Sequence, residues 1–153
     1  MTERVRVNVV TDHSCFGCGE RNPIGLKLAF YRHGDAVEAE FIPRPEHEGY
    51  IGVVHGGIIG ALLDEAMSWA VIADGRLAVT AQMTLRFRRP VAVGKLVRVR
   101  GQVAEERGRL VQARAVLLDG EGAVLAEASG TFVRVDKAQQ RAWEERYLNR
   151  QST

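Results

Sequence analysis

The sequence predicts an α+β fold in which an antiparallel sheet curls around one long, buried helix. Residues 55–73 are apolar on nearly every side of a helix, with only Asp64 and Glu65 charged. Such a helix must be buried, and this one is too short to cross a membrane comfortably. Segments before and after it alternate apolar and polar residues, as antiparallel strands with one buried face do. Because strand candidates flank the helix on both sides in the sequence, we expect the sheet to wrap it.

Two strands are predicted before the helix and four after it. The first pair is residues 26–30 and 37–41, joined by a hairpin turn at residues 32–35. The later strands cover residues 79–88, 97–103, 111–117 and 126–132, with a turn at residues 119–122 between the last two. In each strand, one set of alternate residues is apolar, so we expect that set to face the core.

The C-terminal residues predict a polar surface helix that starts near Asp136. Its apolar stripe consists of Trp143, Tyr147 and Leu148. The 153 residues fit one domain, 1–153, with a core at about 15–135 and a C-terminal helix and tail at 136–153. We find no linker-like tract and no internal repeat.

Composition excludes several classes of protein. The chain is 46% hydrophobic and 26% charged, as an ordinary globular domain is. Its net charge of +2 is too small to indicate nucleic-acid binding. No apolar run is long enough for a membrane span, and charges interrupt the apolar N-terminal stretch, so we expect no secretory signal. With two cysteines, the sequence favours a reducing cytoplasm.

Asp64 is the first candidate catalytic residue, because it lies in the middle of an apolar helix. A carboxylate there is costly unless it is paired, hydrogen-bonded or in contact with a wet cavity. Buried ionisable groups mark functional sites often enough to make Asp64 a candidate. An ion pair or a cap for a neighbouring loop is the structural alternative, and Glu65 is the alternative carboxylate. Such a group acts as a general base on water or as a nucleophile.

Gly56 and Gly57 are predicted to begin the buried helix. The first amides of a helix lack intrahelical partners and lie at the positive end of its dipole, so they can bind a developing oxyanion. Glycine lets a substrate approach without a side chain in the way; the alternative is a tight turn. His55 orients the substrate or holds the loop. Gly57 and Asp64 are about 10 Å apart along one helix, too far to act easily on one carbonyl.

Five arginines on two predicted strands form a basic face: Arg86, Arg88, Arg89, Arg98 and Arg100. Arginine binds phosphates through its planar fork, although a solvated sheet edge is the commoner role of such charges. Arg88 and Arg89 are the better phosphate candidates, because Pro90 ends the strand beside them. We find no phosphate-binding glycine loop.

Cys15 and Cys18 form a C-x2-C pair, which raises the possibilities of zinc and of redox chemistry. Zinc takes four ligands, usually from a second close pair, and the histidines at 13, 33 and 47 supply no such pair. A redox pair usually leads into a helix, whereas turn-forming residues follow here. We therefore interpret both cysteines as structural, packing a loop near the substrate entrance.

Three segments resemble the hotdog-fold thioesterases of the phenylacetate-degradation (PaaI) type. They read CFGCGERNPIGL, GVVHGGIIGALLDEAM and VTAQMTLRFRRPVAVG, and HGG-x6-D is their most specific part. The resemblance, from about residue 15 to 135, implies an acyl-CoA thioesterase that needs no metal or redox cofactor. It implies a homodimer, often a homotetramer, with Gly57 of one subunit and Asp64 of the other at each active site. The implied catalytic residues are Asp64, Gly57, His55 and Thr80, and the alternative for Thr80 is a solvent-facing strand residue. The candidate substrate contacts are Gly56, Glu65, Gln82, Arg88 and Arg89.

Two other functions are compatible with this fold. One is a non-catalytic acyl-CoA-binding sensor or scaffold, although no DNA-binding domain accompanies it. The other is a hydratase or dehydratase, which HGG-x6-D argues against because those enzymes use a different arrangement of His and acidic residues. The acyl group is not determined, although the lack of polar anchors among the predicted pocket residues favours aliphatic or aryl groups. Those residues are Ile58, Leu62, Met67, Trp69 and Met83.

Overall fold

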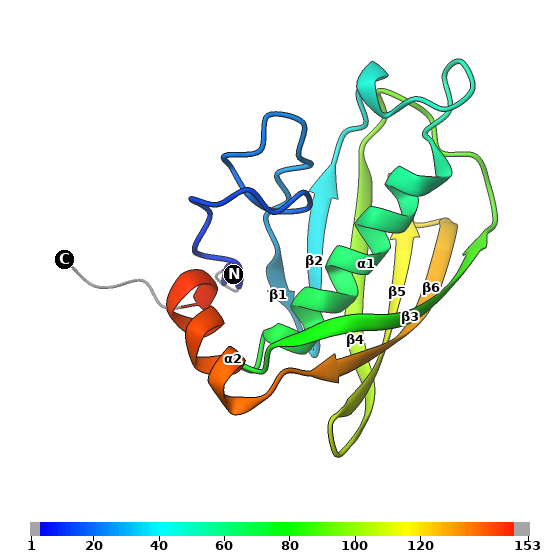
Figure 1. Cartoon of the computed structure of the whole chain (residues 1–153). Coiled ribbons are helices and arrows are strands. Elements are labelled where there is room, and N and C mark those ends of the chain that lie inside the picture. Colours follow the sequence, from blue (N-terminus) through cyan, green and yellow to red (C-terminus); the bar gives the residue numbers. More distant parts are fainter. Residues whose placement is uncertain (1–3, 149–153) are drawn as a thin grey trace.

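A computed structural model describes residues 4–148 as one curved antiparallel sheet with a long helix, α1, packed in its concave face (Figure 1). The strands are β1 (Tyr31–His33), β2 (Ala36–Phe41), β3 (Ala78–Phe87), β4 (Val97–Arg107), β5 (Leu110–Leu118) and β6 (Val124–Arg134). The helices are η1 (Pro45–His47), α1 (Gly56–Ile72), α2 (Lys137–Trp143) and the π-helical turn η2 (Glu144–Leu148). The predicted order of two strands, a helix, four strands and a terminal helix is confirmed. Among these residues, no helix has the length and apolarity needed to span a membrane.

The strands follow the order β1-β2-β4-β5-β6-β3 across the sheet. β4, β5 and β6 pair through successive hairpins, whereas β3 comes directly after α1 and pairs with β6. β3 therefore forms one edge of the sheet and β1 forms the other. In Figure 1 the N-terminal loop lies beside α1, and α2 lies near the end of α1. The ring of His13 in this loop meets that of Tyr147 in η2 edge-on at 5.0 Å.

The core lies between α1 and the sheet. Leu62, Leu63, Ala66 and Met67 of α1 are fully buried. The closest approach is at Gly101 of β4, where an added Cβ would lie 2.2 Å from the carbonyl oxygen of Ala66. Only glycine, which has no Cβ, lets the strand backbone come so near the helix.

The first predicted strand is displaced along the chain. Leu28 and Phe30 are buried, as the alternation predicted, but β1 begins only at Tyr31. The reason is Asn8: its side-chain amide donates to Leu28 O at 2.7 Å, and its Oδ1 accepts the Phe30 N–H at 2.8 Å. A side chain thus occupies backbone groups that a strand ladder would use. His33, predicted in the turn, is the last residue of β1.

The apolar face of β3 is less buried than its alternation predicted. Val79 is 46% exposed and Phe87 is 53% exposed, although both belong to the apolar set. For Phe87 the cause is the position of β3 at the sheet edge, with a neighbouring strand on one side alone within the described chain. For Val79 the cause is the irregular pairing between Thr80 and Gln82, which turns Val79 to the outer face of the sheet. The apolar sets of β5 and β6 are buried as predicted, because these strands lie inside the sheet under α1.

We expect Gly101→Ala to lower the free energy of unfolding by about 1–3 kcal/mol, because the new methyl group collides with the backbone of α1. Denaturant unfolding followed by circular dichroism measures this change. The matched control is Gly120→Ala, since a Cβ at Gly120 has no neighbour within 4 Å, and we expect a change within about 0.5 kcal/mol. Equal effects of the two changes would contradict the close packing of α1 on β4.

Candidate active site

Asp64 is held by a hydroxyl from the neighbouring edge strand. Thr80 of β3 donates through Oγ1 to Asp64 Oδ1 at 2.7 Å. Asp64 is half-buried in the middle of α1, and it takes part in none of the ion pairs between residues 4 and 148. A hydrogen bond to Thr80, rather than an ion pair, is thus the contact that the structure gives this carboxylate.

A β-bulge turns Thr80 toward α1. Thr80 pairs with Phe132 of β6, but Gln82 pairs with Thr131, so one extra residue stands between them on β3. Phe132 is fully buried on the face of the sheet toward α1, and Thr131 lies on the opposite face, where its hydroxyl donates to Gln112. Strict alternation would have put Thr80 and Gln82 on one face. The bulge instead leaves Gln82 exposed and facing away from the Asp64 of its own chain, which does not support its predicted contact with a substrate held there.

His55 is the N-cap of α1. The His55 Nδ1 accepts a hydrogen bond from the Gly57 N–H at 2.8 Å. The backbone oxygen of His55 accepts the Ile58 N–H at 3.0 Å, and the backbone N–H of His55 donates to His47 O at 2.9 Å. The Gly57 amide, the predicted oxyanion donor, is therefore engaged by the imidazole. The neighbouring Gly56 N–H donates none of the hydrogen bonds found in the described part of the chain. Gly56 is the freer donor at this helix end.

A pocket of about 300 Å³ opens beside the start of α1. It brings Gly56 together with Arg88 and Arg89 at the end of β3. Arg88 also forms an ion pair with Glu127 at 2.7 Å. The sequence singled out these two arginines as phosphate contacts, which stays a prediction, and the structure adds that both lie beside the start of α1.

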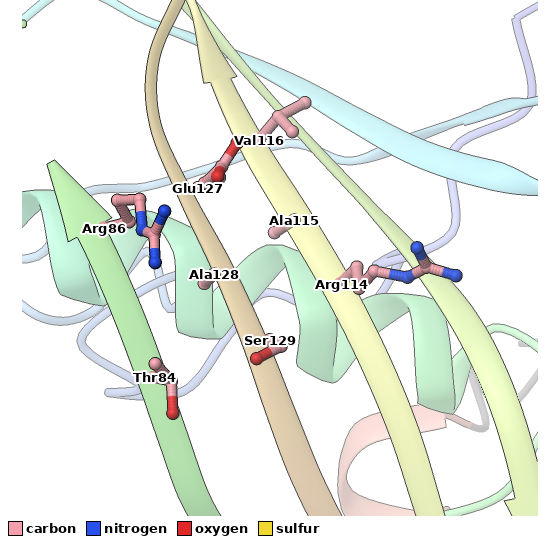
Figure 2. A pocket seen from close by; sticks show the side chains of 8 residues that line it. All are labelled: Thr84, Arg86, Arg114, Ala115, Val116, Glu127, Ala128 and Ser129. Atoms are coloured by element: carbon pink, nitrogen blue, oxygen red, sulfur yellow. The ribbon is translucent and has the colours of Figure 1, made fainter. Parts of the chain in front are cut away.

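The remaining arginines of the predicted basic face are not near this pocket. Arg98 and Arg100 pair with Glu40 and Glu38 on β2, at 3.8 and 2.8 Å, so they are charge-balanced strand residues. Arg86 lines a groove of about 540 Å³ on the other face of the sheet (Figure 2). There it shares the groove with Arg114 of β5, and β6 runs between them. Arg86, Arg98 and Arg100 thus share the outer face of the sheet, because the register joins Arg100 to Arg86 through Val116 and Glu127. Arg88 and Arg89 instead line the pocket beside the start of α1.

Glu65 faces away from Thr80, toward the N-terminal loop. Its carboxylate accepts a hydrogen bond from Trp69 Nε1 at 3.0 Å and lies 3.7 Å from Cys15 Sγ. Burial raises the pKa of Glu65 to about 7, and the Cys15 sulfur adds to this effect. The loop presses so closely that a Cβ at Gly17 would lie 2.3 Å from Glu65 Cδ. Sequence reasoning missed this cluster, because nothing in the spacing links Cys15 and Cys18 to a residue 50 positions away.

Residues 51–126 match the sequence profile of the thioesterase superfamily. The chain contains a thioesterase-superfamily domain. This domain has the predicted hotdog fold, in which the curved sheet wraps α1. It is similar in structure to the PaaI protein of the E. coli phenylacetic acid degradation operon, with a TM-score of 0.68 and 19% identity over 72% of this chain and 81% of that one.

Two curated relatives differ in their named activities. Acyl-coenzyme A thioesterase THEM4 of Bos taurus is 26% identical over 79% of this chain and 51% of the bovine protein. The 3-hydroxybutyryl-CoA dehydratase of Methylorubrum extorquens is 35% identical over 69% of this chain and 64% of the relative. The chain thus spans about half of the bovine protein and under two thirds of the bacterial one. Both names refer to enzymes that act on coenzyme A thioesters.

The structure of a hypothetical thioesterase from Streptococcus pneumoniae has been solved with coenzyme A. It superimposes with a TM-score of 0.64 and 19% identity, over 65% of this chain and 81% of the streptococcal chain. Two variants of it have also been solved, one with an aspartate and one with a threonine replaced by alanine. The two replaced positions are 16 residues apart, the same separation as Asp64 and Thr80 in the thioesterase-superfamily domain described here.

We expect acidification to loosen the loop before α1, because His47 is buried there as a neutral ring. Its Nδ1 accepts the Arg44 N–H at 2.9 Å, and burial, together with the Arg44 charge, lowers its pKa. His47 therefore takes up a proton less readily in the folded than in the unfolded protein. The free energy of unfolding falls as the pH drops below about 6.5, the pKa of histidine in the unfolded chain. Amide hydrogen exchange of residues 44–58 should speed up between about pH 7.5 and 5.5 beyond the chemical trend. In His47→Gln this extra acceleration should vanish; its persistence would assign the effect to another group.

Proposed function

We propose that the chain is an acyl-CoA thioesterase, which hydrolyses an acyl-CoA to a free acid and coenzyme A. The observation that carries the proposal is the half-buried Asp64 carboxylate, held by the Thr80 hydroxyl on a thioesterase-superfamily domain. The matching separation of the two replaced residues in the streptococcal variants supports the same pair. The domain, 1–153 as a single unit, would work in a cytoplasm that keeps Cys15 and Cys18 as free thiols.

The two oxygens of the Asp64 carboxylate would have different roles. Thr80 donates to Oδ1 of Asp64, which fixes the plane of the carboxylate and leaves Oδ2 for chemistry. As a general base, Oδ2 takes a proton from water while the water oxygen attacks the thioester carbonyl. The tetrahedral intermediate then expels the coenzyme A sulfur, which receives the proton. As a nucleophile, Oδ2 attacks first, expels the coenzyme A thiolate and forms a mixed anhydride. Water then cleaves the anhydride, which releases the free acid, restores the Asp64 carboxylate and supplies the proton for the thiolate.

The oxyanion of that intermediate would be bound at the start of α1. Gly56 offers an exposed amide at the positive end of the helix dipole. The Gly57 amide would donate a second hydrogen bond to the oxyanion once the His55 imidazole moves aside, since that ring is exposed and can rotate. The adjoining pocket places Arg89 and Arg88 where they could bind the phosphates of coenzyme A, and Arg89 is the better candidate because Arg88 already pairs with Glu127.

The active site would be completed by a second subunit. Gly56 lies about 12 Å along α1 from Asp64, at 1.5 Å per residue, so one chain does not place both groups on one carbonyl. The open edge at β3 exposes the apolar side chains of Phe87 on the face toward α1 and of Val79 on the outer face, as an edge buried by a partner would. We propose a homodimer that pairs around β3, with Gly56 of one subunit opposite Asp64 of the other. Two such dimers could form a tetramer.

Free thiol release from a panel of short, medium, long and aryl acyl-CoAs tests the activity. We expect Asp64→Asn to lower kcat/KM by about 100- to 10,000-fold, the usual contribution of a general base. Thr80→Val should lower it by roughly 10- to 100-fold, because a hydrogen bond to a charged group is lost. Asp74→Asn is the matched control, since Asp74 is an exposed carboxylate that pairs with Arg32 at the far end of the helix. Its rate should match that of the wild type.

Two outcomes of that panel would favour the other functions. Acyl-CoA that binds but is never cleaved would replace the thioesterase proposal with a binding protein. Hydration of an enoyl-CoA that depends on Asp64, without thiol release, would favour the dehydratase chemistry named in the Methylorubrum relative.

Mixed dimers test the shared site. Gly56→Val fills the pocket at the helix start, and its Cβ meets only the Phe87 ring at an ordinary 3.7 Å, so the fold should persist. Each homodimer of Asp64→Asn or Gly56→Val should be inactive. Mixing the two variants should restore activity, because one of the two sites in a heterodimer is then intact. If both groups came from one subunit, every site would stay defective and mixing would restore nothing.

A further inference from the structure

A second group of reactive side chains lies where the N-terminal loop packs on α1. It consists of Cys15, Cys18 and Glu65, whose sulfur and carboxylate atoms all lie within 4.8 Å of one another. Cys18 is buried, and the other two are half-buried. The proposed hydrolysis at Asp64 uses none of the three.

The two cysteines form a preorganised turn. The Gly19 N–H donates to Cys15 O at 2.9 Å and closes the turn that brings the two cysteines together. Cysteine binds metal ions as the thiolate. The turn also requires glycine at position 19, where a Cβ would lie 2.3 Å from His13 O.

The group places one carboxylate next to two sulfur atoms. No lysine or arginine among residues 4–148 forms an ion pair with Glu65. The nearby His13 has both ring nitrogens engaged, with Val10 O at 3.0 Å and the Cys15 N–H at 3.3 Å. A dication bound between the three side chains would supply the positive charge.

We propose that Cys15, Cys18 and Glu65 bind a zinc ion. Two thiolates favour zinc over magnesium or calcium, which prefer oxygen ligands alone. Zinc bonds of about 2.3 Å to sulfur and 2.1 Å to oxygen, at a tetrahedral angle, require a sulfur–oxygen separation of about 3.6 Å. The Cys15 sulfur lies 3.7 and 3.9 Å from the two oxygens of Glu65, so this pair of ligands is spaced as a tetrahedral zinc site requires.

The surroundings supply the rest of a zinc site. Trp69 donates to Oε2 of Glu65 and thereby orients the carboxylate, as second partners of metal ligands do. A cavity of about 210 Å³ borders all three ligands, and its walls include Trp143 and Tyr147 from the C-terminal helix. The fourth position of the ion opens onto this cavity, where water or a small ligand can bind. The ion would tie the N-terminal loop to α1 one residue beyond Asp64.

Cobalt titration of the reduced, chelator-treated protein tests the proposal, because thiolate-bound Co²⁺ shows charge-transfer absorption. We expect absorption that saturates at one ion per chain, is displaced by Zn²⁺ and is accompanied by a higher Tm with zinc. Cys18→Ser and Glu65→Gln should each weaken binding at least tenfold. Asp64→Asn, which changes the adjacent carboxylate, should bind cobalt as the wild type does. These readouts do not depend on hydrolysis.

Three results would overturn the proposal: no charge-transfer band, equal cobalt affinity in Cys18→Ser and the wild type, or a Cys15–Cys18 disulfide that forms as readily with zinc as without it. Should Cys18→Ser fail to fold, alkylation of the wild-type thiols decides the matter. Zinc should protect both cysteines from iodoacetamide, and unchanged alkylation would again rule the site out.

Discussion

The burial of α1 is the constraint on which the rest of the structure depends. A helix that is apolar on nearly every side has to be covered on nearly every side, and a single flat sheet cannot do this. The sheet therefore curves around the helix, and β4 approaches so closely that position 101 has no room for a side chain. This contact fixes the depth of the helix in the sheet, and with it the place of each residue that α1 presents at its margins.

The sheet covers α1 incompletely, and the functional groups lie at its two uncovered margins. On one side β3 is an edge strand, and there Asp64 meets Thr80 next to exposed apolar surface. On the other side the N-terminal loop takes the place of a strand and covers Glu65 with Cys15 and Cys18. Adjacent carboxylates thus have different surroundings: one is held by a hydroxyl and is accessible, and the other is packed against sulfur with a raised pKa. Asp64 and Glu65 are both carboxylates, so the difference between their roles comes from their positions relative to the sheet edges.

The start of α1 shows how one helix end serves structure and binding together. His55 caps the helix through Gly57, and its backbone rests on the buried His47. This arrangement satisfies one of the unpaired amides that every helix leaves at its start, and it leaves Gly56 facing a pocket beside two arginines. The same cap that stabilises the helix therefore controls how many amides a bound carbonyl can reach.

The sequence by itself determined the order of the elements, the buried helix and the importance of Asp64, because each follows from local periodicity or from one charge in an apolar segment. Tertiary structure decided what depends on contacts between distant segments. The bulge that turns Thr80 toward α1 breaks the alternation from which its orientation was predicted. Asn8 replaces strand pairing near β1, and the partner of Cys15 is Glu65, on a helix 50 residues away. The spacing of residues along the chain does not predict these contacts, because the curvature of the sheet and the path of the N-terminal loop bring the groups together.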